Sequence, residues 1–281
     1  MKSSHQGILR LPVQSTPFAG ASKKKANKIP QNVVFVSREC SIRLQLLNLV
    51  AIIMSAFSAV PRLLYFNIEG AAEKVRLAFI LSGVEFNDDR ISMPAPNWAS
   101  IKATLPNGQV PVLYTGDKVI TQSSAMARWA ARKGDGSLYP VLNEDLCLKI
   151  DELIGIAEDD ARDFRTCIYI GMKPSAFGYP EDFATTEEGQ AMVKKIRETW
   201  VAEDLPRYMG HLTGALTKNG GPFLTGSGIT LADVWWLPRV RYLNAGIATH
   251  IPSDCLAAYP EVVAWKERML AEPKIAAWYK K

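Results

Sequence analysis

The stretch LPNGQVPVLYTGDKVITQSSAMARWAARK, residues 105–133, decides how the chain folds. Two runs rich in β-branched and aromatic residues, 110–114 and 118–121, flank a loop that contains Gly116, and together they predict a β-hairpin. From residue 123 to residue 133 apolar side chains recur at helical spacing, which predicts a helix directly after the second strand. The stretch therefore predicts a β-β-α unit.

Strand and helix patterns alternate in the residues before this unit. Residues 62–66 (RLLYF) are a short apolar run typical of a buried strand, and residues 71–81 carry apolar side chains at helical spacing. Residues 84–91 predict a polar edge strand, and residues 98–103 predict a short helix or turn. The first part of the body is therefore α/β, with the element order β-α-β-α-β-β-α.

No strand pattern recurs after Pro140. Four later segments are helical in period: 141–169, 186–211, 230–244 and 260–280. The residues Gly134-Asp-Gly-Ser137 have the composition of a linker between the two regimes. We expect a leader and two domains: a basic leader at 1–60, an α/β domain at 61–137 and an all-helical domain at 140–281.

The positive charge of the chain lies in its first residues. The 281 residues carry a formal charge of +5, but residues 1–62 hold nine Lys and Arg against one acid, Glu39, and the other 219 residues hold 24 bases and 27 acids. The body of the protein is therefore mildly acidic. The run Lys23-Lys24-Lys25 has no interleaved aromatic residues, so we expect no nucleic-acid partner.

The composition of the leader leaves three interpretations open. Residues 1–30 are rich in Ser, Lys, Gly and Pro, which predicts disorder, and the uninterrupted apolar core at 49–54 is shorter than the roughly 20 residues of a membrane-spanning helix. In the first, Met54 is the functional start and residues 1–53 are untranslated or dispensable. In the second the leader is a targeting sequence, and in the third it is a membrane anchor. We expect a cytoplasmic protein with no membrane partner, and organelle or secretory targeting by residues 1–60 is the alternative.

The cysteines and histidines do not predict a metal site. They are scattered, without the paired spacing of metal ligands: Cys40, Cys147, Cys167, Cys255, His5, His211 and His250. We therefore expect free thiols in a reducing compartment and no bound metal.

Five short motifs, taken in order, resemble those of cytosolic glutathione transferases, and most closely those of the sigma class, which includes haematopoietic prostaglandin D synthase. They are Tyr65-Phe-Asn, Trp98-x-x-x-Lys102, Leu105-Pro-Asn-Gly-Gln-Val-Pro-Val-Leu113, Gln122-Ser-x-Ala125 and Gly-x-x-x-Thr-x-Ala-Asp233. The resemblance covers about residues 62–281. It implies a thioredoxin-like N-terminal domain, an all-helical C-terminal domain and a homodimer. It also implies glutathione as a cosubstrate for conjugation or isomerisation, with no permanently bound cofactor.

The resemblance implies that Tyr65 is the catalytic residue. A free thiol has a pKa of about 8.5, and ionising it near neutral pH requires a decrease of about two units, or roughly 2.7 kcal/mol. One hydrogen bond to a charged group contributes about 1.5 to 3 kcal/mol. A hydroxyl at the end of the first strand, donated to the glutathione sulfur, therefore supplies an energy of the required size.

The resemblance also implies how glutathione is held. The Val110-Pro111 bond corresponds to the cis X-Pro bond of thioredoxin-like folds, and the backbone beside it, from Gln109, is free to pair with the cysteinyl unit. Gln122 and Ser123 lie at a predicted helix N-terminus, which suits the γ-glutamyl carboxylate. Ser123 would also serve as the N-cap of that helix whatever the ligand.

Two further contacts with glutathione follow from the same resemblance. Trp98 and Lys102 share one face of the second helix, where the indole would pack on the tripeptide and the ammonium would meet its glycyl carboxylate. In this family an acid of the partner subunit reaches the glutathione amine, and the resemblance matches that acid to Asp159.

The electrophile pocket carries one departure from the family. The resemblance draws its lining from six residues of the first loop and the long helix: Ile68, Gly70, Arg162, Arg165, Thr166 and Tyr169. Sigma-class proteins usually have an Arg six residues after the catalytic Tyr, and here that residue is Ala71. We therefore expect a thiolate that is less stabilised than in the family, attacking a small apolar electrophile.

The segment around Thr230 and Asp233 predicts architecture rather than chemistry. A Thr followed three residues later by an acid has the spacing of a capping box, so we expect both side chains to be structural. Two functions stay open for the whole protein. One is a sigma-like glutathione transferase, and the other is a non-catalytic protein that binds glutathione or another ligand or has a structural role, as the S-crystallins do.

Overall fold

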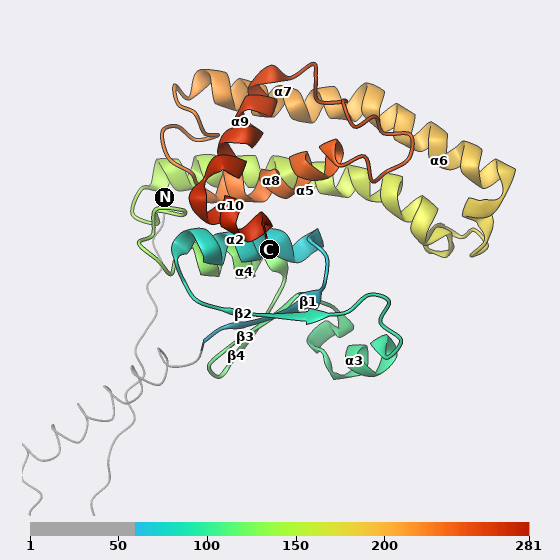
Figure 1. Cartoon of the computed structure of the whole chain (residues 1–281), viewed down its shortest axis with the longest axis horizontal. Coiled ribbons are helices and arrows are strands. Elements are labelled where there is room, and N and C mark those ends of the chain that lie inside the picture. The colour runs from blue at the N-terminus through green and yellow to red at the C-terminus, as the bar shows by residue number, and fades with distance from the viewer. Residues whose placement is uncertain (1–59, 281) are drawn as a thin grey trace, which may run out of the picture. The chain divides into compact units, whose positions relative to one another are not determined.

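A computed structural model describes residues 60–280. The predictions for the leader therefore lie outside the described residues, apart from its last residue. Figure 1 shows a sheet-containing part followed by a helical part. Among residues 60–280, no helix combines the length and the apolar character that crossing a bilayer requires.

The sheet has four strands in the order β2-β1-β3-β4. Strand β1 (Arg62–Phe66) pairs in parallel with β2 (Asn87–Ile91) and antiparallel with β3 (Val112–Thr115), and β3 pairs antiparallel with β4 (Lys118–Thr121). The parallel pair requires a crossover, which α2 (Glu73–Ser82) supplies. The strand predicted to begin at residue 84 begins at Asn87 and lies at the sheet edge.

Two helices cover one face of this sheet. Helix α2 and helix α4 (Ser123–Ala131) pack against each other between the sheet and the helical part, and α3 (Trp98–Thr104) lies on the opposite side (Figure 1). Short 3-10 turns at Gly70–Ala72 and Pro106–Gly108 precede α2 and β3. The predicted β-α-β-α-β-β-α order is confirmed, because each of its seven elements is present.

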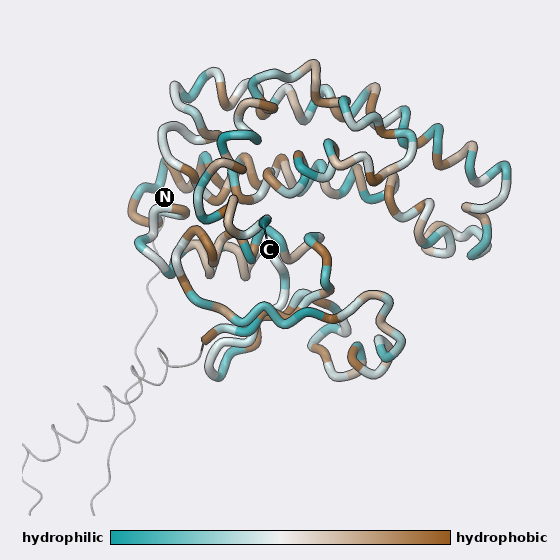
Figure 2. Tube along the Cα trace, viewed as in Figure 1, coloured by the Kyte–Doolittle hydropathy of each residue, from teal (hydrophilic) through white to brown (hydrophobic). Residues whose placement is uncertain are grey.

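The rest of the described chain is helical. Its helices are α5 (Glu144–Met172), α6 (Glu187–Thr199), α7 (Leu205–Lys218), α8 (Leu231–Asn244), α9 (Pro260–Ala271) and α10 (Pro273–Tyr279). Hydrophobic and hydrophilic residues alternate along these helices in Figure 2, as expected of helices that each bury one face. One continuous core joins the two parts, since Leu63 and Phe79 belong to the same buried cluster as Ile154 and Trp236.

Three predicted helices have different bounds. The prediction of a single helix at 186–211 is wrong, because a π-helical turn at Trp200–Asp204 separates α6 from α7. The helix predicted at 260–280 is divided at Pro273, whose ring and missing N–H cannot continue α9. Helix α5 begins at Glu144 rather than residue 141, because the Asn143 side chain accepts from the Leu146 amide and caps it.

Candidate active site

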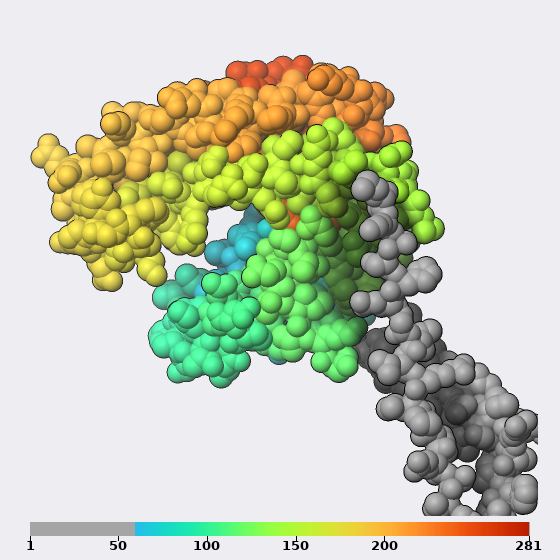
Figure 3. All heavy atoms as spheres, turned by 180° about the vertical axis from the view of Figure 1, so that it is seen from behind, coloured from blue at the N-terminus to red at the C-terminus, as the bar shows by residue number. Residues whose placement is uncertain are grey.

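Tyr65 lies near the end of β1, where the chain turns into the 3-10 turn before α2. Its side chain is buried, and the backbone N–H of Ala71 donates a hydrogen bond to its hydroxyl oxygen over 3.1 Å. Figure 3 shows a hollow between α5 and the segment around α3, with the chain around the β1–α2 turn at its base. Because the oxygen accepts from Ala71, the hydroxyl hydrogen remains available for donation.

Gly70 leaves room for this hydroxyl. A Cβ atom added at Gly70 would lie 2.5 Å from the Tyr65 hydroxyl oxygen, and the residue has a φ of +42°, which side chains other than glycine rarely adopt. The sequence assigned Gly70 to the electrophile pocket. In the structure it is packed against the hydroxyl of Tyr65 as well.

The surroundings of Tyr65 keep its phenol protonated. Burial raises the pKa of Tyr65, and this effect outweighs the hydrogen bond from Ala71 and the positive charge of Arg76, which both lower it. The phenol is therefore a hydrogen-bond donor at neutral pH rather than a base. A donor is what a thiolate beside it would need.

Strand β3 begins directly after the predicted peptide-binding residues Gln109, Val110 and Pro111. The last pair between β1 and β3 joins Leu64 to Val112, and the preceding Val110-Pro111 bond is cis, as predicted. Within residues 60–280 the backbone N–H and C=O of Val110 make no hydrogen bond to another backbone group. Pro111 is buried and Gln109 is exposed. The edge beside Tyr65 is thus open to an extended ligand.

The N-terminus of α4 lies next to this edge. Gln122 is its N-cap, with a φ of 71° that is rare outside glycine, and its side chain makes no capping hydrogen bond. The expectation that Ser123 would be the N-cap is therefore wrong, since Ser123 is the first helical residue. In the described part of the chain no backbone carbonyl accepts from the amides of Ser123 or Ser124. These amides can bind an anion.

Trp98 and Lys102 extend the site along α3. The Trp98 ring is half-buried and lies 4.9 Å from the Phe66 ring, which in turn lies 5.6 Å from the Tyr65 ring. Lys102 is exposed one turn further along the helix, with its side chain over Gly108. The aromatic series places α3 beside the strand that carries Tyr65.

Helix α5 forms the opposite wall. Tyr169 lies within electrostatic reach of Tyr65, since it contributes to the raised pKa of that residue, and the Arg165 guanidinium lies 5.3 Å from the Tyr169 ring centre. Thr166 is half-buried on the same helix, and Ile68 on the facing loop is 48% exposed. Arg162 pairs with Asp159 at 2.9 Å on the exposed surface of α5.

Thr230 and Asp233 lie apart from this cluster. One Asp233 oxygen accepts from the amide and hydroxyl of Thr230 at 2.9 and 3.1 Å. The other accepts from the Leu224 amide and from the Trp265 indole at 2.9 and 2.8 Å. Asp233 is fully buried, so these four donors satisfy both of its oxygens at the start of α8.

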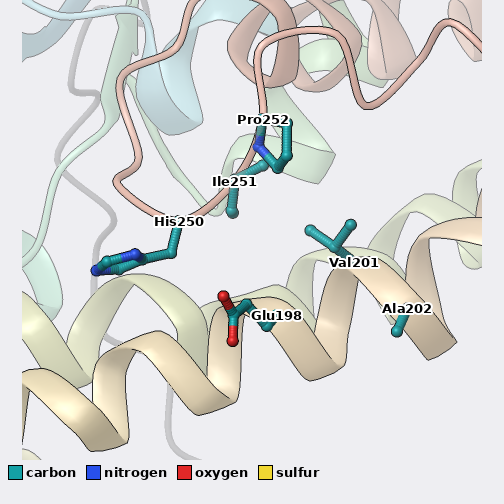
Figure 4. Close-up of a pocket in the computed structure, with 6 residues that line it drawn as sticks. All are labelled: Glu198, Val201, Ala202, His250, Ile251 and Pro252. Carbon is teal, nitrogen blue, oxygen red and sulfur yellow. The ribbon is translucent and has the colours of Figure 1, made fainter.

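Two other features do not contribute to the site. A pocket beside the π-helical turn is lined by Glu198, Val201, Ala202, His250, Ile251 and Pro252 (Figure 4). None of these six is a predicted site residue. Within residues 60–280, no group of three or more His, Cys, Asp and Glu side chains could hold a metal ion, and the three described cysteines are free.

The described residues form a thioredoxin-like sheet followed by a helical domain, and Tyr65, the backbone of Val110 and the start of α4 lie on neighbouring parts of that sheet. Two family models match the chain: "Glutathione S-transferase, N-terminal domain" over residues 71–133 and "Glutathione S-transferase, C-terminal domain" over residues 181–281. The chain belongs to the glutathione S-transferase family, and it is a glutathione transferase.

Individual relatives agree with this assignment. Glutathione S-transferase S1 of Drosophila melanogaster is 31% identical over 220 residues, which is 78% of this chain and 77% of the relative. Human hematopoietic prostaglandin D synthase is 26% identical and covers 78% of this chain and 95% of its own length. The solved structure of prostaglandin synthase D of Nilaparvata lugens has a TM-score of 0.62 at 29% identity, and covers 79% of this chain and 98% of its own. The sigma-like resemblance is confirmed.

Sequence reasoning missed the groups that act on the hydroxyl of Tyr65. Ala71 was interpreted only as a missing arginine, whereas its backbone N–H is the donor to the phenol oxygen. The buried cation Arg76 was also missed. A lone Arg within an apolar helical repeat, three residues after Glu73, was the available signal.

Proposed function

We propose that the chain conjugates glutathione to small apolar electrophiles and that Tyr65 stabilises the glutathione thiolate. The observation that carries this proposal is the hydrogen bond from the Ala71 amide to the Tyr65 hydroxyl oxygen at 3.1 Å. It leaves the hydroxyl hydrogen free and polarises it, because chained hydrogen bonds strengthen one another. The Ala71 amide therefore offsets part of what the absent arginine side chain would contribute.

The chemistry needs no further acid or base. The glutathione thiol releases its proton to solvent, the Tyr65 hydroxyl donates to the resulting thiolate, and the sulfur electron pair attacks the electrophile. A hydrogen bond to a charged group contributes about 1.5 to 3 kcal/mol, close to the roughly 2.7 kcal/mol that a two-unit decrease in thiol pKa requires. The same thiolate could serve a glutathione-dependent isomerisation.

The proposed glutathione site follows the open edges beside Tyr65. The cysteinyl unit pairs with the free backbone of Val110, between Gln109 and Pro111. The γ-glutamyl carboxylate binds at the start of α4, beside Gln122 and Ser123, where the amides of Ser123 and Ser124 are unpaired. The glycyl end lies along α3, where Trp98 packs on the peptide and Lys102 pairs with its carboxylate.

We further propose that the active site is completed by a second subunit. Asp159 is exposed on α5, and in a homodimer it would meet the γ-glutamyl amine bound to the partner chain. Its ion pair with Arg162 joins two exposed side chains, which contributes little and can exchange for the amine. Ile68, Gly70, Arg165, Thr166 and Tyr169 remain to line the electrophile pocket, with Arg162 at its edge.

A turnover assay tests the proposal. We expect the wild-type chain to conjugate a chlorodinitrobenzene-type electrophile and to bind immobilised glutathione. Changing Tyr65→Phe should lower kcat/KM by about 10- to 100-fold, because the lost hydrogen bond to the thiolate is worth about 1.5 to 3 kcal/mol, while glutathione binding is retained. Glutathione binding without turnover of this electrophile in the wild type would contradict the proposed conjugation of small apolar electrophiles.

A further inference from the structure

A buried arginine holds the segment that presents Ala71 to Tyr65. The Arg76 side chain is fully buried on α2, and its guanidinium donates to the carbonyl oxygens of Ile68 at 2.6 Å and Phe66 at 3.2 Å. Both carbonyls belong to the segment 66–71, which runs from the end of β1 to the amide that contacts Tyr65. The Arg76 guanidinium also lies 5.7 Å from the centre of the Tyr65 ring.

Two carboxylates balance and orient this cation. Glu73, one turn earlier on α2, accepts from Arg76 at 3.1 Å, and Asp88 on β2 accepts at 2.9 Å. Glu73 is as deeply buried as Arg76, whereas Asp88 is half-buried and also pairs with the exposed Arg90. A buried guanidinium with carboxylates on two sides has little freedom to rotate, so its two carbonyl contacts fix the segment 66–71.

The C-terminal helix α10 anchors this network from outside. The Trp278 indole donates to the second oxygen of Glu73 at 2.8 Å, although the two residues lie 205 positions apart. A parallel contact ties the loop to α8, because Arg241 donates to Glu69 at 2.8 Å while it stacks over the Tyr279 ring at 3.6 Å. Helices α10 and α8 thus contact both the start of α2 and the loop before it.

We infer that α10 is a positioning element for the reaction: through Trp278, Glu73 and Arg76 it holds the segment 66–71 so that the Ala71 amide stays on the Tyr65 hydroxyl. The inference rests on the proposed role of Tyr65. Trp278, Glu73 and Arg76 are positioning residues, since Arg76 reaches the hydroxyl only through the loop that it binds. If Arg76 shifts, the loop carbonyls and the amide of Ala71 shift with it, and Tyr65 becomes a weaker donor to the thiolate.

The test is a Trp278→Phe variant of the full chain. It removes the indole N–H that meets Glu73 and keeps an aromatic ring beside Phe86 and Arg90. The pKa of the thiol of bound glutathione is measured from the ultraviolet absorbance of the thiolate, together with kcat and KM for glutathione. We expect the thiol pKa to rise by about 0.5 unit and kcat at pH 6.5 to fall about twofold, with KM unchanged.

An Arg76→Lys variant applies the same test closer to the hydroxyl. A lysine keeps the charge but cannot reach two carbonyls and two carboxylates at once, so we expect a larger rise in thiol pKa than in Trp278→Phe. Trp129→Phe is the matched control, because the Trp129 ring packs with Phe79 and Lys133 of the same domain rather than with a residue of the Arg76 network. Its thiol pKa should equal that of the wild type.

The outcomes separate this inference from the proposed function. A thiol pKa that is unchanged in Trp278→Phe, or that rises equally in Trp129→Phe, overturns the positioning role of α10. Tyr65→Phe is titrated alongside: if only that variant raises the thiol pKa, the positioning inference fails and the proposed function stands. If Tyr65→Phe leaves the thiol pKa unchanged, the proposed function itself fails, and the inference fails with it.

Discussion

At the scale of single residues, two backbone features act on the hydroxyl oxygen of Tyr65. The Ala71 amide donates to it, and the missing side chain at Gly70 lets the loop approach it. In both cases the group at the hydroxyl is the backbone rather than a charged side chain. The loss of an arginine at position 71 therefore removes a cation without removing the donor to the phenol.

Changing Gly70→Ala should damage the site directly. The new Cβ would lie 2.5 Å from the Tyr65 hydroxyl oxygen and would have to adopt a φ of +42°. We expect kcat to fall about tenfold, the effect of about 1.4 kcal/mol in transition-state stabilisation. Gly116→Ala is the matched control: its φ is +57°, but an added Cβ meets nothing within 4 Å, so it should lower stability and leave kcat unchanged. Equal kcat losses in both variants would contradict the steric argument.

At the scale of elements, the start of α8 is organised by one buried carboxylate. Asp233 accepts from four donors, two of which, the Leu224 amide and the Trp265 indole, come from outside the helix. It therefore joins α8 to α9 and to the loop before α8. The capping box is a local sequence pattern, but these two outer donors could not be predicted from it.

An Asp233→Asn variant should be less stable than the wild type. Its NH₂ group would face N–H and O–H donors, which leaves buried groups unpaired at a cost of about 1 to 3 kcal/mol or more. The free energy of unfolding in urea measures this loss. Asp145→Asn, an exposed first-turn acid of α5, is the control and should change stability by only a few tenths of a kcal/mol. Similar losses in both variants would contradict the structural role.

At the scale of the whole molecule, the sheet domain and the helical domain meet at a lysine. The Lys74 ammonium on α2 lies 4.8 Å from the Trp235 ring centre on α8. The negative charge of Glu158 on α5 acts to raise the pKa of Lys74. Burial nevertheless lowers the pKa of Lys74 to about 8. The charge at this junction therefore costs stability at neutral pH.

The sign of the pH dependence follows from this lowered pKa. An unfolded lysine has a pKa of about 10.4, so between pH 8 and pH 10.4 the unfolded state binds more protons and the folded state gains stability as pH rises. We expect Lys74→Met to be more stable than the wild type at pH 7, by about 2 to 3 kcal/mol, and the difference to shrink toward pH 10. Chemical denaturation at both pH values measures it, and a variant less stable than the wild type at pH 7 would contradict the argument.

Much of the fold could be predicted because its signals are local. The hairpin and the helical second domain follow from short motifs and periodicity, and the cis Val110-Pro111 bond follows from the family resemblance. The network around Arg76 could not be predicted, since its partners come from β2 and from α10 at the far end of the sequence. The π-helical turn at Trp200–Asp204 interrupts a sequence whose helical period continues through it, so the division of that helix also escaped prediction.

The central claim is that the Tyr65 hydroxyl stabilises the glutathione thiolate, and titrating the thiol of bound glutathione tests it most directly. The ultraviolet absorbance of the thiolate is followed against pH in the wild type and in Tyr65→Phe. We expect a thiol pKa about two units below the free value of about 8.5 in the wild type and a return toward 8.5 in the variant. Equal thiol pKa values in the two proteins would contradict the account.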